Sequence, residues 1–372
     1  MYFVFNEGIM KRILTRKLVP GMVLANDVHT YNSSLKLLDK GTVLEDKDIA
    51  RLAFYSIIDV LIEDELVELE NEFVDITNDE GLTYSERIKQ SPEFKEFKHS
   101  FEECAEKFEH TIKDIIENNR DLVFDDMMAP IYGLLEKGRS SANIFDMLHN
   151  LRSYDDATFT HSINVALISN ILAQWLKWDE SEVEIATQSG LFHDIGKLLI
   201  PDEIIRKPDK LTEDEYTLMQ THPQRGYEII KNLNISQHIK NATLMHHERC
   251  DGSGYPLKIR GPQIDKFGKL VAIADVYDAM TSARYYRGPL CPFIAISMFE
   301  EEGYQKYDPE MIIAFLQNIV NTYLLNTVRL STGEIGEIIF INKMHLSRPT
   351  VKVGNDYIDL TKCPDVYIKE II

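Results

Sequence analysis

Five histidines and two aspartates fall in segments whose apolar residues recur at helical spacing, and this feature constrains the fold more than any other. They are His161, His193, Asp194, His222, His246, His247 and Asp275. Asp275 stands in the apolar run KLVAIADVYDAM, where a buried charge is costly without a partner. A lone histidine on such a helix is more often a hydrogen-bonded core residue than a ligand. A cluster of this composition is favourable in a core mainly where cations offset the desolvation.

This residue set predicts a two-metal hydrolytic site. Mixed imidazole and carboxylate ligands suit iron, manganese or zinc, and they do not favour calcium or magnesium. Because Asp194 directly follows His193, its carboxylate can bridge two cations while the imidazole binds one of them. A water between two such cations has a lowered pKa and becomes a hydroxide nucleophile near neutral pH. We therefore expect two divalent cations, iron or manganese before zinc, and hydrolysis of a phosphate ester.

The segment that carries these residues, 151–325, has a helical pattern throughout. Apolar residues recur every three or four positions in HSINVALISNILAQWL and in EIATQSGLFHDIGKLLI. Thr212 and Glu215 have the spacing of a capping box, which marks the start of a helix. No run of alternating polar and apolar residues interrupts the segment. It therefore predicts an all-helical catalytic domain and a mainly α fold class.

Two smaller regions flank this domain and alternate with a period of two. In residues 1–64, strand patterns occur in LVPGMVLANDV, LLDKGTVL and 58–62, and a helix is expected from Asp46, which predicts a small α+β module. It is interpreted as a packing or oligomerisation module, with a sensory or partner-binding role as the alternative. Residues 326–372 alternate around Thr-Gly and Gly-Asn turns, which predicts an antiparallel β appendage.

The helical connector, 65–150, carries one long apolar stripe on a charged helix. Its members are Phe97, Phe101, Cys104, Phe108, Ile112 and Ile115. Spacings of three and four place them on one face. The stripe either covers the next domain or pairs with a second subunit, which would make the protein a homodimer.

Composition excludes several classes of function. The formal net charge of -20 argues against binding of a nucleic-acid polymer, which needs a basic surface. The 4 cysteines include no CxxC pair, so a disulfide scaffold or thiolate zinc site is not expected. No apolar run approaches the roughly 18 residues that span a bilayer. We expect a cytoplasmic protein without a membrane span.

Three motifs in a fixed order resemble the HD-GYP family, a branch of the HD phosphohydrolases. They are HDIGK at 193–197, HHERCDGSGYP at 246–256 and IADVYDAMTSARYYR at 273–287. The resemblance covers roughly residues 155–320. It implies an HD-type helical fold and hydrolysis of cyclic di-GMP to linear pGpG, with GMP as the product of a second cleavage.

The resemblance also implies roles for individual residues. The first cation would take His161, His193, Asp194 and Asp275. The second would take Asp194 as the bridge together with His222, His246 and His247. Lys197 matches the family lysine that reaches a substrate phosphate, so Asp194 and Lys197 are the expected catalytic residues. The alternative for Lys197 is a solvated surface lysine.

The expected substrate contacts lie in two of the motifs. They are Lys197, Gly254, Tyr255, Pro256, Asp278, Arg284 and Arg287. Asp278 is alternatively a partner that orients a metal-bound histidine. The two arginines are alternatively exposed salt-bridge partners.

The chain departs from the family pattern at Ala157, where some members carry a third-metal glutamate. Two cations are therefore favoured over three. Two other functions remain open. The same site would serve a phosphodiesterase for another cyclic dinucleotide, such as a mixed guanine–adenine one. It would also serve a nucleotide-binding receptor or signalling scaffold that acts through partner signalling proteins without turnover.

Overall fold

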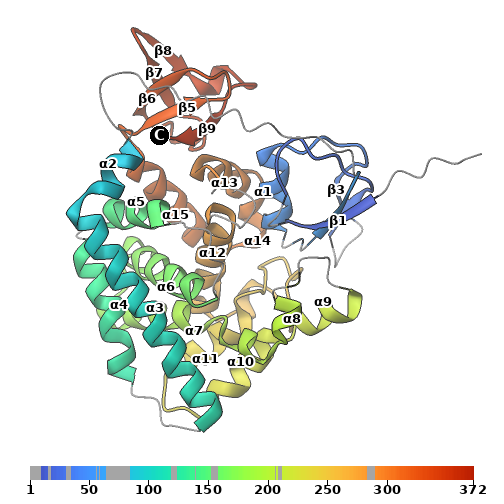
Figure 1. Ribbon diagram of the computed structural model, residues 1–372, viewed down its shortest axis with the longest axis vertical. Coiled ribbons are helices and arrows are strands. Elements are labelled where there is room, and N and C mark those ends of the chain that lie inside the picture. The colour runs from blue at the N-terminus through green and yellow to red at the C-terminus, as the bar shows by residue number, and fades with distance from the viewer. Residues whose placement is uncertain are drawn as a thin grey trace, which may run out of the picture.

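The computed structural model describes residues 10–15, 18–30, 35–55, 57, 59–63, 84–118, 124–138, 140–151, 158–205, 207, 212–282 and 290–372. A small N-terminal module, a helical body and a C-terminal sheet follow one another along the chain (Figure 1). This arrangement confirms the expected mainly α class with its α+β and antiparallel β additions. No helix within these ranges is long and apolar enough to cross a bilayer. The four cysteines are free thiols.

Two short strand pairs and one helix make up the described part of the N-terminal module. They are β1 (Met10–Leu14) with β4 (Asp59–Glu63), β2 (Val28–His29) with β3 (Lys36–Leu38), and α1 (Asp46–Phe54). The strand expected from the LVPGMVLANDV pattern is shorter than predicted, because only β2 and single bridges at Val23 and Leu24 are paired. The side chains of this region pack into the module's own apolar cluster even where the backbone is irregular.

The helical body contains the α-helices from α2 to α15. They are α2 (Tyr84–Gln90), α3 (Pro92–Asn118), α4 (Phe124–Gly138), α5 (Ser141–Leu151), α6 (Thr158–Trp175), α7 (Glu180–Phe192), α8 (Asp202–Ile205), α9 (Glu213–Met219), α10 (His222–Ile230), α11 (Gln237–Met245), α12 (Lys266–Thr281), α13 (Pro292–Met298), α14 (Tyr304–Lys306) and α15 (Pro309–Thr322). Short irregular helices connect them: η2 (Ile195–Leu199), η3 (Gly261–Gln263) and the π-helical η4 (Phe299–Gly303). The predicted capping box at the start of α9 is present.

The centre of this body is formed by α6, α7 and α12. Ile163, Leu167 and Ile168 of α6 are fully buried, as are Leu270 and Ile273 of α12. A helix that is apolar on all sides must be covered on all sides, which places these helices inside the body. Asp275 and Asp278 of α12 therefore lie in the interior, away from water.

The apolar stripe of α3 is buried within its own chain. α3 runs along α4 and α6 on the outside of the body (Figure 1). The ring of Phe108 meets Phe159 of α6 and Phe192 of α7 edge-on, with centroid distances of 5.7 and 6.1 Å. The stripe of α3 thus covers the helical body of its own chain, and a homodimer stays a prediction.

The C-terminal sheet has five antiparallel strands in the order β8-β7-β6-β5-β9. They are β5 (Thr327–Leu330), β6 (Ile335–Phe340), β7 (Thr350–Val353), β8 (Asp356–Asp359) and β9 (Ile368–Ile371), with η5 (Leu360–Lys362) between the last two. Gly333 and Gly354 have positive φ angles of 90° and 57° in the predicted turns. Such angles favour glycine, which explains the Thr-Gly and Gly-Asn signals.

Both flanking parts attach to η4. The Glu300 carboxylate accepts hydrogen bonds from the backbone of Leu346 and Ser347 before β7. Glu302 pairs with Arg51 of α1 at 3.2 Å. The Phe54 ring of α1 packs edge-on against Phe299, with a centroid distance of 5.6 Å. One short segment of the helical body therefore anchors the N-terminal module and the sheet.

Phe108→Ala is expected to lower the free energy of unfolding by about 3 to 5 kcal/mol, because it removes a buried ring at the contact of α3, α6 and α7. Urea denaturation of the full chain measures the change. Glu106→Ala, on the exposed side of α3, is the control and should change stability by no more than about 0.5 kcal/mol. Equal effects of the two variants would show that α3 does not help to hold the body together.

Candidate metal centre

Helix ends and central helices bring the predicted ligands together. His161 lies on α6 and Asp275 on α12. His193 and Asp194 follow α7, His222 begins α10, and His246 and His247 follow α11. His193, Asp194, His222 and His246 are almost completely buried. The segments that carry these residues are far apart in sequence, and their convergence is a product of the helical packing.

The first group consists of His161, His193 and Asp194, whose ligand atoms all lie within 4.8 Å of one another. Oδ2 of Asp194 is 3.6 Å from Nε2 of His161 and 3.4 Å from Nε2 of His193. Asp275 adds a second carboxylate here, with Oδ1 3.1 Å from Nε2 of His161 and 3.9 Å from Nε2 of His193. This group matches the ligand set expected for the first cation.

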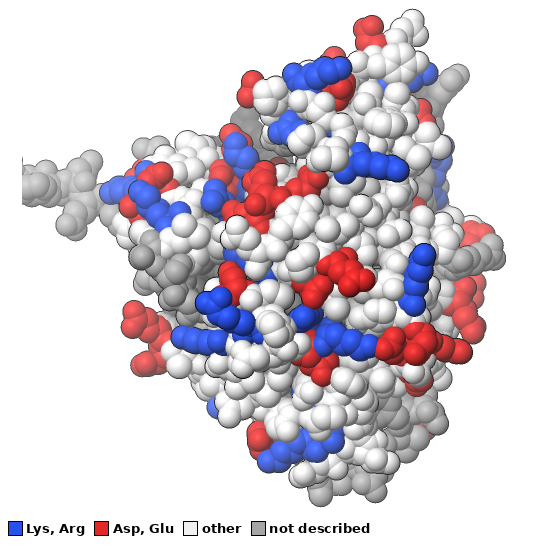
Figure 2. All heavy atoms as spheres, turned by 180° about the vertical axis from the view of Figure 1, so that it is seen from behind, with Lys and Arg blue, Asp and Glu red and all other residues white. Residues whose placement is uncertain are grey.

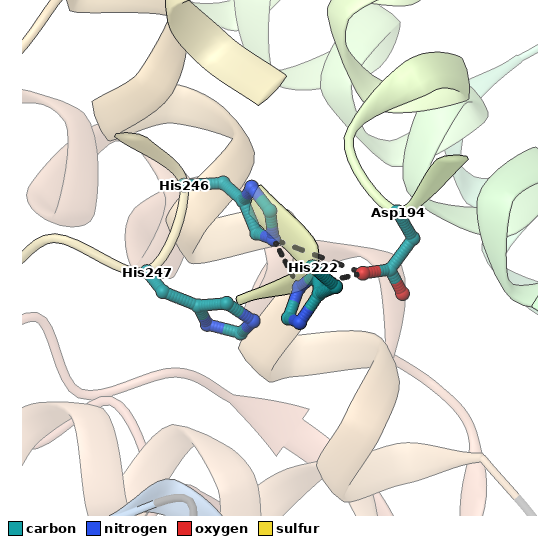
Figure 3. A group of neighbouring side chains, drawn as sticks. All are labelled: Asp194, His222, His246 and His247. Carbon is teal, nitrogen blue, oxygen red and sulfur yellow. Dashed lines mark hydrogen bonds and ion pairs between the residues drawn. The ribbon is translucent and has the colours of Figure 1, made fainter. Parts of the chain in front are cut away.

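The second group consists of Asp194, His222, His246 and His247, whose ligand atoms also lie within 4.8 Å of one another (Figure 3). Oδ1 of Asp194 is 3.2 Å from Nε2 of His222 and 3.7 Å from Nε2 of His246. Asp194 therefore turns one oxygen to each group. This is the arrangement that a bridging carboxylate requires.

Hydrogen bonds on the outer nitrogen hold four of the imidazoles in place. Nδ1 of His193, His222 and His246 donates to the carbonyl oxygen of Gly190, Met219 and Thr243, at 2.7, 2.8 and 2.9 Å. Nδ1 of His161 lies 2.8 Å from Oδ2 of Asp278. A carbonyl only accepts, so Nδ1 carries the proton and the lone pair of Nε2 faces the site.

Burial and neighbouring charges set the protonation of the site. Burial lowers the pKa of His246 and His247 well below the usual value, and neighbouring imidazoles lower it further. Burial raises the pKa of Asp194, but Lys197 and His193 outweigh it and hold this pKa well below the usual value. Neutral imidazoles beside an ionised carboxylate are the forms that bind a cation.

His161 differs from the other imidazoles. Burial lowers its pKa, but hydrogen bonds to Asp275 and Asp278 outweigh burial and raise the pKa to about 10. A cation and a proton therefore compete for Nε2 of His161.

Several buried polar atoms of the site have no hydrogen bond in the described part of the chain. They are Nε2 of His193, Oδ1 of Asp194 and Nδ1 of His247. Unsatisfied buried polar atoms are costly and are rare in folded proteins. Imidazole and carboxylate donors on two sides of one aspartate suit divalent transition metals, so these residues fit a pair of such cations.

Comparison with known proteins gives a consistent result. A family model described as HD domain matches residues 143–311. The cyclic di-GMP phosphodiesterase PA4108 of Pseudomonas aeruginosa is 36% identical over 208 residues, which cover 55% of this chain and 50% of that protein. The HDIGK and HHERCDGSGYP motifs lie inside residues 143–311, which match the HD domain model. Over residues 143–311 the chain carries an HD domain of the HD-GYP type.

Other curated relatives are similar over stretches of comparable length. The cyclic di-GMP phosphodiesterase response regulator RpfG of Xanthomonas campestris pv. campestris is 36% identical over 166 residues, 44% of each chain. The 3'3'-cGAMP-specific phosphodiesterase 2 of Vibrio cholerae is 32% identical over 221 residues, 59% of this chain and 42% of that protein. The chain thus spans half or less of the length of these curated relatives.

The glycine of the HDIGK motif permits the convergence of the two groups. A Cβ on Gly196 would lie 1.9 Å from the carbonyl oxygen of His222 and 2.4 Å from the nitrogen of Gly226. Only a residue without a side chain allows η2 to pack on the start of α10. Gly196 thereby brings His222 within reach of Asp194.

Lys197 lies on η2 beside the site. Its ammonium donates to Oδ2 of Asp194 at 2.5 Å, and its side chain is only partly exposed. The structure thus brings the expected phosphate-binding lysine to the bridging aspartate.

Asp278 lies behind His161 on α12. Its Oδ2 contacts His161, and its Oδ1 accepts hydrogen bonds from Asn164 and Ser282 at 3.1 and 2.9 Å. Both oxygens have partners in the protein, an arrangement that favours the orienting role over contact with substrate. Asn164 was not predicted, because a single asparagine on an apolar helix has no distinguishing signal.

The Gly-Tyr-Pro turn lies against the second group. A Cβ on Gly254 would lie 2.4 Å from Cα of Glu248, so the turn requires glycine there. Tyr255 stacks on His247, and Pro256 continues the turn. Sequence reasoning missed Glu248, whose buried carboxylate accepts hydrogen bonds from the backbone of residues 257–259. Its position directly after the histidine pair was the available signal.

Two of the predicted substrate contacts, Arg284 and Arg287, lie outside the described residues, as does Ala157. Their predicted roles stay predictions.

Gly196→Ala is expected to push η2 from α10, lowering stability by roughly 1–3 kcal/mol and weakening cation binding. Thermal unfolding and the metal content per chain measure both effects. Gly133→Ala is the matched control, because no atom lies within 4 Å of its Cβ position in α4. The control should raise stability by about 0.5–1 kcal/mol. Wild-type metal content in Gly196→Ala would contradict the packing argument.

Proposed function

We propose that the chain is a metal-dependent phosphodiesterase that hydrolyses cyclic di-GMP to linear pGpG and, in a second cleavage, to GMP. The observation that carries the proposal is the position of Asp194, which turns Oδ2 to His161 and His193 and Oδ1 to His222 and His246. A structural histidine cluster has no need for a carboxylate shared between two ligand groups.

The residues would divide the work as follows. His161, His193, Asp194 and Asp275 would hold one cation, and Asp194, His222, His246 and His247 would hold the other. Two iron or manganese ions, or zinc, would supply an acidified water and neutralise charge on the phosphodiester. The ammonium of Lys197, which donates to Asp194, would also bind a phosphate oxygen. Tyr255 stacks on His247, and the turn formed by Tyr255 and Pro256 would border the substrate.

The surface is consistent with a small ligand. Lys and Arg side chains are interspersed with Asp and Glu on the face shown in Figure 2 and do not form a continuous basic track there. With a net charge of -20, the chain would attract phosphate through its cations and Lys197 and not through its overall field.

A mixed guanine–adenine dinucleotide is the second candidate substrate, because a relative named as 3'3'-cGAMP-specific is 32% identical over 221 residues. The metal groups do not distinguish the two nucleotides, because they act on the phosphodiester that both contain. A receptor without turnover is the third candidate, and the complete ligand set argues against it.

The decisive experiment incubates the purified chain anaerobically with Mn(II) or Fe(II) and with each of the two nucleotides. Chromatography follows the products, and mass spectrometry counts the metals. We expect pGpG from cyclic di-GMP with two metals per chain. Asp194→Asn should lose both cations and turnover, because it removes the shared charge. Asp202→Asn, an exposed acid of α8, is the control and should behave as wild type.

Three results would overturn parts of the proposal. Faster turnover of the mixed guanine–adenine nucleotide would make it the proposed substrate in place of cyclic di-GMP. Nucleotide binding by the two-metal chain without product would favour the receptor. Full activity of Asp194→Asn would exclude this site as the catalytic one.

Lys197→Ala is expected to lower kcat/KM by ~10²–10³-fold while two metals stay bound, because the lysine serves the phosphate and not the cations. Steady-state kinetics and metal content measured on one sample test this. Lys231→Ala removes an exposed lysine paired with Glu228 and should leave both values unchanged. An unchanged kcat/KM in Lys197→Ala would show that Lys197 does not contribute to turnover.

A further inference from the structure

His247 is held differently from the other four histidines. Its Nδ1 is buried, lies 3.9 Å from Oδ2 of Asp275 and makes no hydrogen bond among the described residues, whereas Nδ1 of each of the others is within hydrogen-bond distance of a carbonyl or carboxylate. Such an outer partner normally fixes the orientation of a ligating imidazole. Another contact must therefore orient the His247 ring.

The ring of Tyr255 supplies that contact. It stacks on His247 with a centroid distance of 4.6 Å and an interplanar angle of 25°. The backbone nitrogen of Tyr255 also donates to the carbonyl oxygen of His247 at 3.2 Å. The Tyr255 ring also meets the His222 ring nearly edge-on, with a centroid distance of 6.5 Å. Tyr255 thus touches two imidazoles of the second group.

The turn that carries Tyr255 is anchored to the residue after His247. Glu248 accepts hydrogen bonds from the nitrogens of Leu257, Lys258 and Ile259, at 2.6, 3.1 and 3.2 Å. Gly254 packs so closely that a Cβ there would lie 2.5 Å from the carbonyl oxygen of His247. The turn that carries the Tyr255 ring and the backbone of His247 and Glu248 are therefore fixed relative to each other.

We propose that Tyr255 is a positioning residue for His247 and, through it, sets the affinity of the second ligand group for a divalent cation. The proposal rests on the metal-binding part of the proposed function. It gives the Gly-Tyr-Pro turn a role in building the metal centre that is separate from any contact with substrate. Phenylalanine preserves the stacking surface, so Tyr255→Phe should retain the function that Tyr255→Leu loses.

The test measures binding of Mn(II) to the full chain by competition with a chelator, which separates the two ions by affinity. Tyr255→Leu should bind the second ion ~10–100-fold more weakly and the first ion as wild type does. Tyr255→Phe should match wild type for both. Tyr357→Leu, which removes an exposed tyrosine of β8, is the control and should also match wild type.

Two further variants keep the test decisive if Tyr255→Leu folds poorly. Glu248→Gln retains the ring but loosens its anchor, and it should weaken only the second ion. Tyr255→Leu combined with His247→Ala should lose no more affinity than His247→Ala alone, because both changes act on one ligand. Circular dichroism and retention of the first ion show that each variant is folded.

The proposal is overturned if Tyr255→Leu binds both ions as tightly as wild type, if Tyr255→Phe fails like Tyr255→Leu, or if both ions weaken equally. Failure of the proposed function is a separate result. Wild type would then bind two ions without hydrolysing either nucleotide, and the affinities of the variants would still decide the role of Tyr255.

Discussion

The rest of the structure depends on one buried carboxylate. Asp194 faces two histidine groups with its two oxygens and is almost completely buried. A charge in such a place needs partners on every side. Lys197 gives one, and the imidazoles, with the cations they are suited to hold, give the others. To provide these partners, four segments must meet within a few ångströms. They are the end of α7, the turn at Gly196 in η2, the start of α10 and the end of α11.

The same constraint explains why the flanking parts are packed tightly onto the helical body. The nitrogen of Cys250, in the turn after His247, donates to the carbonyl oxygen of Lys306 at 2.8 Å. The guanidinium of Arg249 lies 5.0 Å from the ring centroid of Tyr307. Phe54 of α1 packs on Tyr307 from the N-terminal module. The segment directly after η4 therefore contacts both the turn beside the metal ligands and Phe54 of α1, which lies in the core of the helical body although most of the N-terminal module packs in its own apolar cluster.

The sequence predicted most where a local pattern has only one physical reading. Helical periodicity located the central helices, and glycine turns located the C-terminal sheet. The family resemblance implied the ligand set, although the convergence of these residues depends on packing that no local pattern encodes. Long-range contacts were missed for the same reason: the position of Glu248 after the histidine pair does not by itself indicate its hydrogen bonds to residues 257–259, and the α3 stripe was equally suited to a second subunit. In the N-terminal module, side-chain packing replaces regular strand pairing. The alternation of polar and apolar residues therefore predicted a longer strand than β2.

Desolvation sets the protonation of the metal-centre histidines and also links the stability of the fold to cation binding. Burial keeps His246 and His247 neutral, so their lone pairs are free for a cation at neutral pH. The same burial leaves polar atoms such as Nε2 of His193 without hydrogen bonds, and each such atom costs the fold free energy. A cation that binds the folded chain would offset this cost, by about 2.7 kcal/mol at a concentration 100 times its Kd. Metal binding and stability of the helical body are therefore coupled, because the histidines that would bind the cations also lie at the contacts between the helices.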